Sequence, residues 1–165
     1  KEGRVLSKDP RERLMHTIKM LIAKKNTEIL SQEIKRGMLE KAKKGIYPLR
    51  APIGYLNVKR GDTRVVEPDK NSSAIIRQMF MMMAKGKMSL SQITRVAQAA
   101  GLTRRDGKRM VDNKTVIATL TNPIYCGQFN YQGKQYKGIH KPVVSRKLFG
   151  RVQKKLGDGV ACESA

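Results

Sequence analysis

Lysine and arginine clusters are the parts of this sequence best suited to a chemical task, and the task that they suit is binding phosphate groups. One cluster lies in residues 41–50 and a second in residues 104–114. Over residues 35–60 the chain has eight basic side chains and a single acidic one, Glu40. Side chains of this kind at this density neutralise the phosphates of a polyanion. The two clusters therefore predict a nucleic-acid-binding surface.

The charge of the whole chain supports the same prediction. Its 165 residues include 35 Lys and Arg against 13 Asp and Glu, which gives a formal net charge of +22 and a pI near 10.4. Because self-repulsion at this charge destabilises a compact fold, a polyanionic partner is expected, and nucleic acid is the commonest one. The sequence has no apolar run of about 18 residues and no signal-peptide pattern, so we expect no membrane association and a cytoplasmic location.

Groups for catalysis or metal binding are scarce. His16 and His140 are the only histidines, and neither has a carboxylate or thiol neighbour in the sequence. Both are expected to be ordinary surface or core imidazoles. Cys126 and Cys162 are too few and too far apart for a zinc site or a disulfide framework, and no phosphate-binding glycine loop occurs. We predict no catalytic residue, no metal ligand and no cofactor in this chain.

The first basic cluster continues into residues 45–55, which we call the strap. Pro48 and Pro52 fix φ and remove two backbone donors, while Gly45 and Gly54 mark points where the backbone turns or approaches another group closely. Ordered backbone with few internal hydrogen bonds usually lies against a partner. We therefore expect the end of the preceding helix and the strap to follow the nucleic acid.

The second basic cluster combines a predicted flexible loop with the start of a helix. Its basic residues surround Asp106-Gly107 and lead into Asn113 and Lys114, the first residues of a short helical pattern. This order fits a recognition helix in the major groove of DNA with a loop that grips phosphates; the alternative is a solvated loop before an ordinary amphipathic helix. The predicted DNA-binding residues are Lys41, Lys43, Lys44, Tyr47, Arg50, Arg104, Arg105, Lys108, Arg109, Asn113 and Lys114.

A long helix is expected to carry the first cluster. Asp9 is the predicted cap, Pro10 suits the first helical position, and Gly45 ends a helix over residues 10–44. Its first apolar stripe has no counterpart in the rest of the chain, so we expect a cover from outside it. The stripe consists of Leu14, Ile18, Leu21, Ile22 and Ile29.

Short helices and β-hairpins follow, so the predicted fold class is α+β. Turn and capping signals place hairpins over residues 55–67 and 125–139, and helices over residues 69–84, 90–100, 113–121 and 146–156. The helices at 90–100 and 113–121 have the order of a helix-turn-helix unit with an enlarged turn. Residues 46–156 are expected to form the compact domain, with a frayed tail at 157–165.

Several short motifs occur in a characteristic order. They are Ala51-Pro52-Ile-Gly54-Tyr55, Glu67-Pro68-Asp69 before a helix with Phe80 and Gly86, Ser89-Leu90 with Gly101-Leu102, Leu120-Thr-Asn122-Pro123-Ile-Tyr125-Cys-Gly127, and Val144-Ser145-Arg-Lys-Leu-Phe149 with Val152-Gln153. Together they span nearly the whole chain, which resembles the recombinase domain of the large serine recombinases.

The resemblance implies a DNA-binding domain that positions an attachment site for strand exchange in a mobile-element integrase. It implies that residues 1–45 are the end of a catalytic domain and its long linking helix, and that the nucleophilic serine lies outside this chain, which is then non-catalytic by itself. It further implies double-stranded DNA as partner, a homo-oligomer (a dimer, then a tetramer at synapsis), and bacterial or phage-encoded origin. A stand-alone basic module that binds DNA or RNA, or a transcription regulator, is the alternative.

Overall fold

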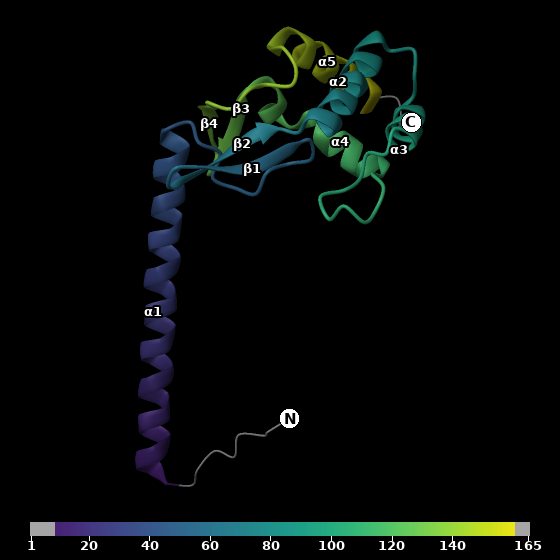
Figure 1. The fold of residues 1–165 in the computed structure, drawn as a ribbon. Coiled ribbons are helices and arrows are strands. Elements are labelled where there is room, and N and C mark those ends of the chain that lie inside the picture. The colour runs from purple at the N-terminus through teal and green to yellow at the C-terminus, as the bar shows by residue number, and fades with distance from the viewer. Residues whose placement is uncertain (1–8, 161–165) are drawn as a thin grey trace. The chain divides into compact units, whose positions relative to one another are not determined.

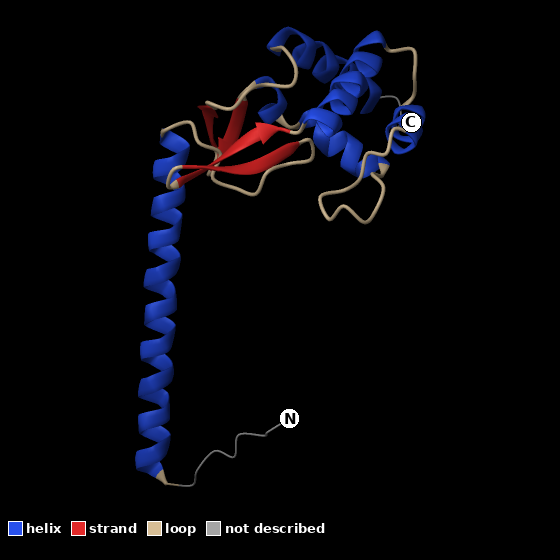
Figure 2. Ribbon diagram, in the orientation of Figure 1, coloured by secondary structure: helices blue, strands red, loops and turns tan. Residues whose placement is uncertain are grey.

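The structure is a computed structural model that describes residues 9–160, with side chains described to residue 157. Its elements are α1 (Pro10–Lys43), β1 (Tyr55–Arg60), β2 (Thr63–Pro68), α2 (Lys70–Lys85), α3 (Leu90–Ala99), α4 (Asn113–Thr121), the 3-10 helix η1 (Pro123–Cys126), β3 (Gln128–Tyr131), β4 (Lys134–Lys137) and α5 (Arg146–Val160) (Figures 1 and 2). The predicted α+β class is confirmed. The chain divides between Glu40 and Lys41 into two compact units.

The long helix α1 agrees closely with its prediction. The Asp9 carboxylate accepts a hydrogen bond from the Arg11 amide at 2.9 Å. At the other end Gly45 has φ +74°, its amide donates to the Ala42 carbonyl, and the Ile46 amide donates to the Lys41 carbonyl. This pair of bonds closes a helix whose next residue is left-handed. The predicted apolar stripe, Leu14, Ile18, Leu21, Ile22 and Ile29, is 40–62% exposed.

In the second unit, both hairpins form with two-residue turns. β1 and β2 pair antiparallel from Tyr55 opposite Pro68 to Arg60 opposite Thr63. β3 and β4 pair antiparallel from Gln128 opposite Lys137 to Tyr131 opposite Lys134. The predicted positions of both turns are confirmed, although the second hairpin is shorter than residues 125–139.

The start of the second predicted hairpin was wrong, because residues 123–126 form η1 instead of a strand. The Asn122 side chain accepts a hydrogen bond from the Ile124 amide at 3.1 Å, and Pro123 has the φ that a helical first turn requires. Gly127, with φ +86°, ends the turn. Three consecutive side chains, Ile124 to Cys126, are buried, which the alternating exposure of a surface strand does not allow.

Local capping signals were the most accurate predictions for the helices. Asp69 caps α2 by accepting from the Ser72 amide at 3.0 Å, and Gly86 ends that helix with φ +67°. Ser89 and Gln92 form the predicted capping box of α3. The last helix continues four residues beyond the predicted end at Leu156, and residues 161–165 of the predicted frayed tail lie outside the described residues.

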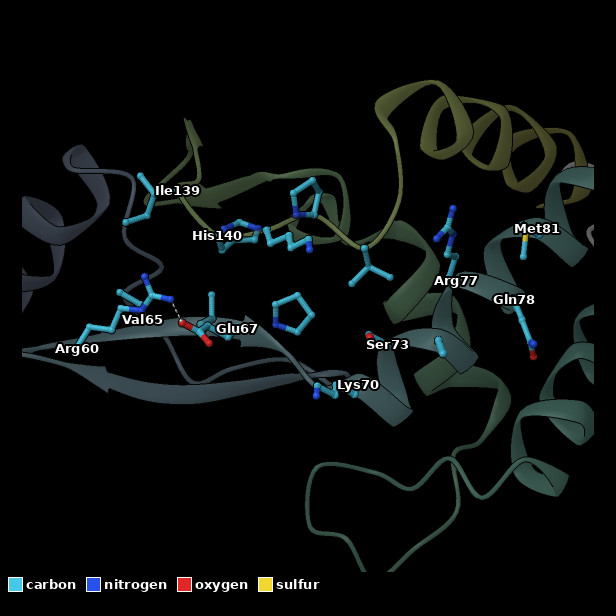
Figure 3. A pocket seen from close by; sticks show the side chains of 16 residues that line it. Arg60, Val65, Glu67, Lys70, Ser73, Arg77, Gln78, Met81, Ile139 and His140 are labelled. Carbon is cyan, nitrogen blue, oxygen red and sulfur yellow. Dashed lines mark ion pairs between the residues drawn. The ribbon is translucent and has the colours of Figure 1, made fainter.

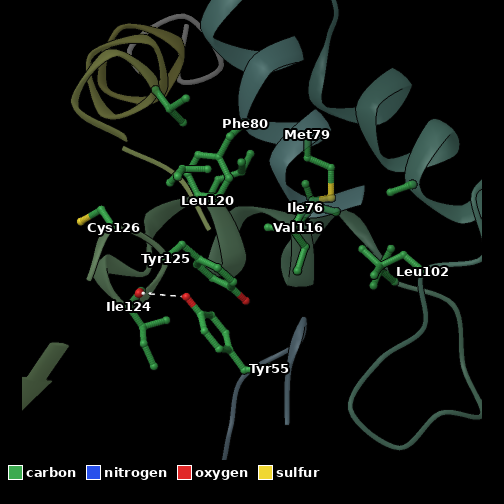
Figure 4. Packing of buried hydrophobic residues seen from close by; sticks show 14 of the residues in the cluster. Tyr55, Ile76, Met79, Phe80, Leu102, Val116, Leu120, Ile124, Tyr125 and Cys126 are labelled. Carbon is green, nitrogen blue, oxygen red and sulfur yellow. Dashed lines mark hydrogen bonds between the residues drawn. The ribbon is translucent and has the colours of Figure 1, made fainter. Parts of the chain in front are cut away.

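The core lies where α2, α4, α5 and η1 meet the start of β1 (Figure 4). Tyr125 is 1% exposed, and its ring centroid lies 5.7 Å from that of Tyr55 and 5.8 Å from that of Phe80. The Tyr55 hydroxyl donates to the carbonyls of Lys141 and Ile124 at 3.1 and 3.5 Å. Aromatic packing and hydroxyl bonds therefore join segments that are distant in the sequence.

Candidate nucleic-acid interface

The strap has an inner side that belongs to the core. Ala51 is 6% exposed, and the carbonyl of Ile53 accepts a hydrogen bond from the Tyr125 hydroxyl at 2.7 Å. At its beginning, Gly45 accepts from the Ile139 amide at 3.0 Å, just beyond β4. The protein's own core therefore holds one side of the strap.

The predicted cations lie at or just beyond the end of α1 and, in the case of Arg50, within the strap. Lys41, Lys43, Lys44 and Arg50 are all exposed. Tyr47 is only half-buried, and its ring packs edge-on against Phe129 with centroids 5.4 Å apart. Tyr47 therefore supports the strap by packing, while the lysines and the arginine face solvent.

The basic loop contains several hydrogen bonds between its own residues. Thr103 and Met110 form a β-bridge at its base, and the Arg104 amide donates to the Arg109 carbonyl at 2.7 Å. Within the turn, the Asp106 carboxylate accepts from the Lys108 and Arg109 amides at 3.1 and 3.3 Å. These bonds lower the pKa of Asp106 below its ordinary value.

The acidic side chain of Asp106 thus shapes the turn, and four cations flank it in the sequence; the Nη1 atom of Arg104 lies 4.0 Å from an Asp112 carboxylate oxygen. Arg104, Arg105, Lys108 and Arg109 are exposed. The residues flanking the loop, Leu102 and Val111, are 2% and 1% exposed, so both ends of the loop are anchored in the core. An anchored basic turn loses less conformational entropy on binding than a free one.

Helix α4 begins where this loop ends. Asp112 caps it by accepting from the Thr115 amide at 2.9 Å, and hydrogen bonding to Thr115 lowers the pKa of Asp112. The Gln98 side chain donates to the Val111 carbonyl at 2.7 Å, and the Asn113 amide group donates to the Ser91 hydroxyl at 3.3 Å. These two bonds tie the start of α4 to α3.

Asn113 and Lys114 are exposed in the first turn of α4. α3 and α4 contact each other, although residues 100–112 between them are much longer than the three or four residues of an ordinary helix-turn-helix. That insertion is the basic loop.

Burial raises the pKa of the Tyr47 hydroxyl, and the positive charge of Arg105 opposes this rise.

A separate groove of about 960 Å³ lies between β2, the first half of α2 and residues 139–143 (Figure 3). Four cations line it: Arg60, Lys70, Arg77 and Lys141. The sequence analysis did not assign a site here, because the lining comes from segments that are distant in the sequence. Arg60 is engaged in part by Glu67, whose carboxylate oxygen lies 2.6 Å from its Nη2.

His140 also lines this groove, but its side chain is buried like that of a core residue. It is 7% exposed, and its Nε2 lies 2.7 Å from the Ile124 carbonyl, an acceptor that requires the proton on Nε2. Burial lowers the pKa of His140, and among the described residues its Nδ1 has no hydrogen-bond partner. The exposed histidine of the pair, His16, lies on α1. Neither imidazole is hydrogen-bonded to a described carboxylate.

Across the described residues, no group of three His, Cys, Asp or Glu side chains could hold a metal ion. Cys126 is buried, and burial raises the pKa of its thiol, whereas Cys162 lies outside the described residues. None of the described helices is long and apolar enough to cross a membrane.

This chain matches one protein family, and its fold is similar to that of several solved structures. The family model described as Recombinase matches residues 70–158. A crystal structure of an LSR–DNA complex superposes on this chain with a TM-score of 0.60 at 22% sequence identity. A second structure, from work on the sequence requirements of the Listeria innocua prophage attP site, superposes with a TM-score of 0.59 at 22% sequence identity. Each match covers 74% of this chain, but only 38% and 50% of the respective structures. No curated protein sequence matches.

Proposed function

The chain belongs to the Recombinase family, and from this premise we propose that residues 41–160 bind double-stranded DNA at an attachment site and position it for strand exchange by a serine recombinase. The observation that carries the proposal is a pair of exposed basic segments, residues 41–50 and the basic loop, each tied to the core. Ala51, Leu102 and Val111 are buried beside them, and a capped helix with a polar first turn follows the loop directly. DNA-binding domains of this kind orient on DNA through phosphate contacts on both sides of the helix that reads the bases.

On the resemblance to serine recombinases, we assign strand cleavage to a catalytic domain of the intact protein outside residues 41–160. One solved relative is described as an LSR–DNA complex, and another by the sequence requirements of a prophage attP site. These descriptions support DNA as the partner of this chain. The exposed stripe of α1 supports association with further copies in the intact protein, and the expected location is the bacterial cytoplasm.

The proposal is tested with duplexes that the chain itself enriches from a random pool. Fluorescence anisotropy should show the enriched DNA bound at least about tenfold more tightly than a scrambled duplex. An RNA duplex of the same length is the second arm, because its deep, narrow major groove does not admit a helix. Equal or tighter binding of RNA would favour the alternative of a general basic module.

A second measurement separates binding from catalysis. Incubation of the chain with supercoiled plasmid carrying the enriched sites should yield no nicking and no covalent adduct that survives denaturation. Such an adduct would contradict the assignment of the nucleophile to another domain.

A further inference from the structure

Ile117 is an apolar side chain on the exposed side of α4, at its border with the core-facing side. It is 41% exposed, whereas Val116 and Leu120, which lie about 100° and 60° from it around the helix, are fully buried. Its neighbours on the outer face are Asn113 and Lys114, one turn earlier, and Ala118 and Thr121, all of them exposed. The face is therefore polar or small except at this one position.

Helix propensity does not account for isoleucine here, and core packing accounts for it only in part. A β-branched residue is a weaker helix former than alanine, and nearly half of this side chain remains in contact with solvent. Single exposed apolar residues are common on protein surfaces, so exposure alone has no functional meaning. The position of Ile117 is what suggests a function: it lies on the helix that follows the basic loop, on the same exposed face as Asn113.

We propose that Ile117 contacts the C5-methyl group of a thymine in the DNA major groove and so contributes to sequence reading. This inference rests on the proposed function. The thymine methyl is the apolar group that base edges present in that groove. Asn113, held by Ser91, lies four residues before Ile117 and thus about 6 Å away along the helix axis. That distance corresponds to roughly two base-pair steps, and the small Ala118 leaves room for a close approach.

Deoxyuridine is the probe that tests the contact, because it lacks only the methyl group of thymine. In the duplex enriched by the wild-type chain, each thymine is replaced singly by deoxyuridine, and affinity is measured for wild type and Ile117→Ala. At one position the wild type should lose about fourfold in affinity, the equivalent of one buried methyl-sized group. The same replacement should leave the affinity of Ile117→Ala unchanged, while Ile117→Val should keep most of the wild-type sensitivity.

Met81→Ala is the matched control, since Met81 is exposed to the same degree, 40%, but lies on α2. It should respond to deoxyuridine as the wild type does. If every replacement affects wild type and Ile117→Ala equally, or if no duplex is preferred over another, the inference is overturned while DNA binding stands. If the wild type binds no DNA duplex at all, the proposed function itself fails.

Discussion

Gly54 illustrates how a single residue fixes the path of the strap. Its φ is +81°, and a Cβ at this position would lie within contact of the buried Ile76 side chain, clashing with its Cδ1. Gly54→Ala should therefore lower the free energy of unfolding by more than the ~1–3 kcal/mol of backbone strain, as measured by urea denaturation.

Gly61 provides the control, because it has φ +58° in the turn between β1 and β2 but nothing within 4 Å of an added Cβ. Gly61→Ala carries only the backbone strain. Equal destabilisation at the two positions would contradict the view that the strap is packed tightly on Ile76.

His140 should make stability depend on pH. Because burial lowers its pKa in the folded state below the ordinary value of 6.5, the unfolded chain binds a proton more readily than the folded one. The stabilisation from neutral His140 is complete above about pH 6.5 and is lost as the pH falls through the folded-state pKa. Urea titrations between pH 5 and 8 should show the free energy of unfolding decreasing toward the acid end.

His140→Gln, which retains a donor for the Ile124 carbonyl, should flatten that dependence. His16→Gln should leave it unchanged, because His16 is exposed on α1. A wild-type profile that rises on acidification would show that other groups dominate the linkage.

At the scale of elements, the basic loop and α4 should divide their contacts between phosphates and bases. Arg105→Ala or Asn113→Ala should weaken binding to the enriched duplex by ~1–3 kcal/mol and binding to a scrambled duplex much less. Lys108→Ala, at the tip of the loop, should weaken both by similar amounts. Fluorescence anisotropy on the two duplexes measures this difference. Equal losses of affinity on both duplexes for all three variants would mean that the segment binds DNA only through its charge.

The elements that sequence patterns predicted well are those with local causes. The caps at Asp69, Ser89 and Asp112 depend on a side chain and an amide three residues apart, so neighbouring residues specify them. The 3-10 helix at residues 123–126 was misread because burial of three consecutive side chains depends on distant segments. The groove between β2, α2 and residues 139–143 depends on the folded core as well, and no sequence spacing predicts it.

At the scale of the whole molecule, the question is whether the net charge of +22 acts as a general field or through particular contacts. Neutralising a phosphate releases condensed counterions, so each lost contact should reduce the slope of log affinity against log salt by about 0.9. Changing Lys43, Lys44 and Arg50 together to Ala should then reduce the slope by about 2.7, with similar losses on enriched and scrambled duplexes.

A second triple variant, Lys85, Lys87 and Lys154 to Ala, removes the same charge from exposed positions on or next to α2 and α5. If Lys43, Lys44 and Arg50 contact phosphates, this control should keep the wild-type salt slope and lose affinity only through the weaker long-range field. Equal slopes for the two variants would mean that the charge acts as a general field. The outer side of the strap would then contribute no more to DNA binding than any other positively charged surface.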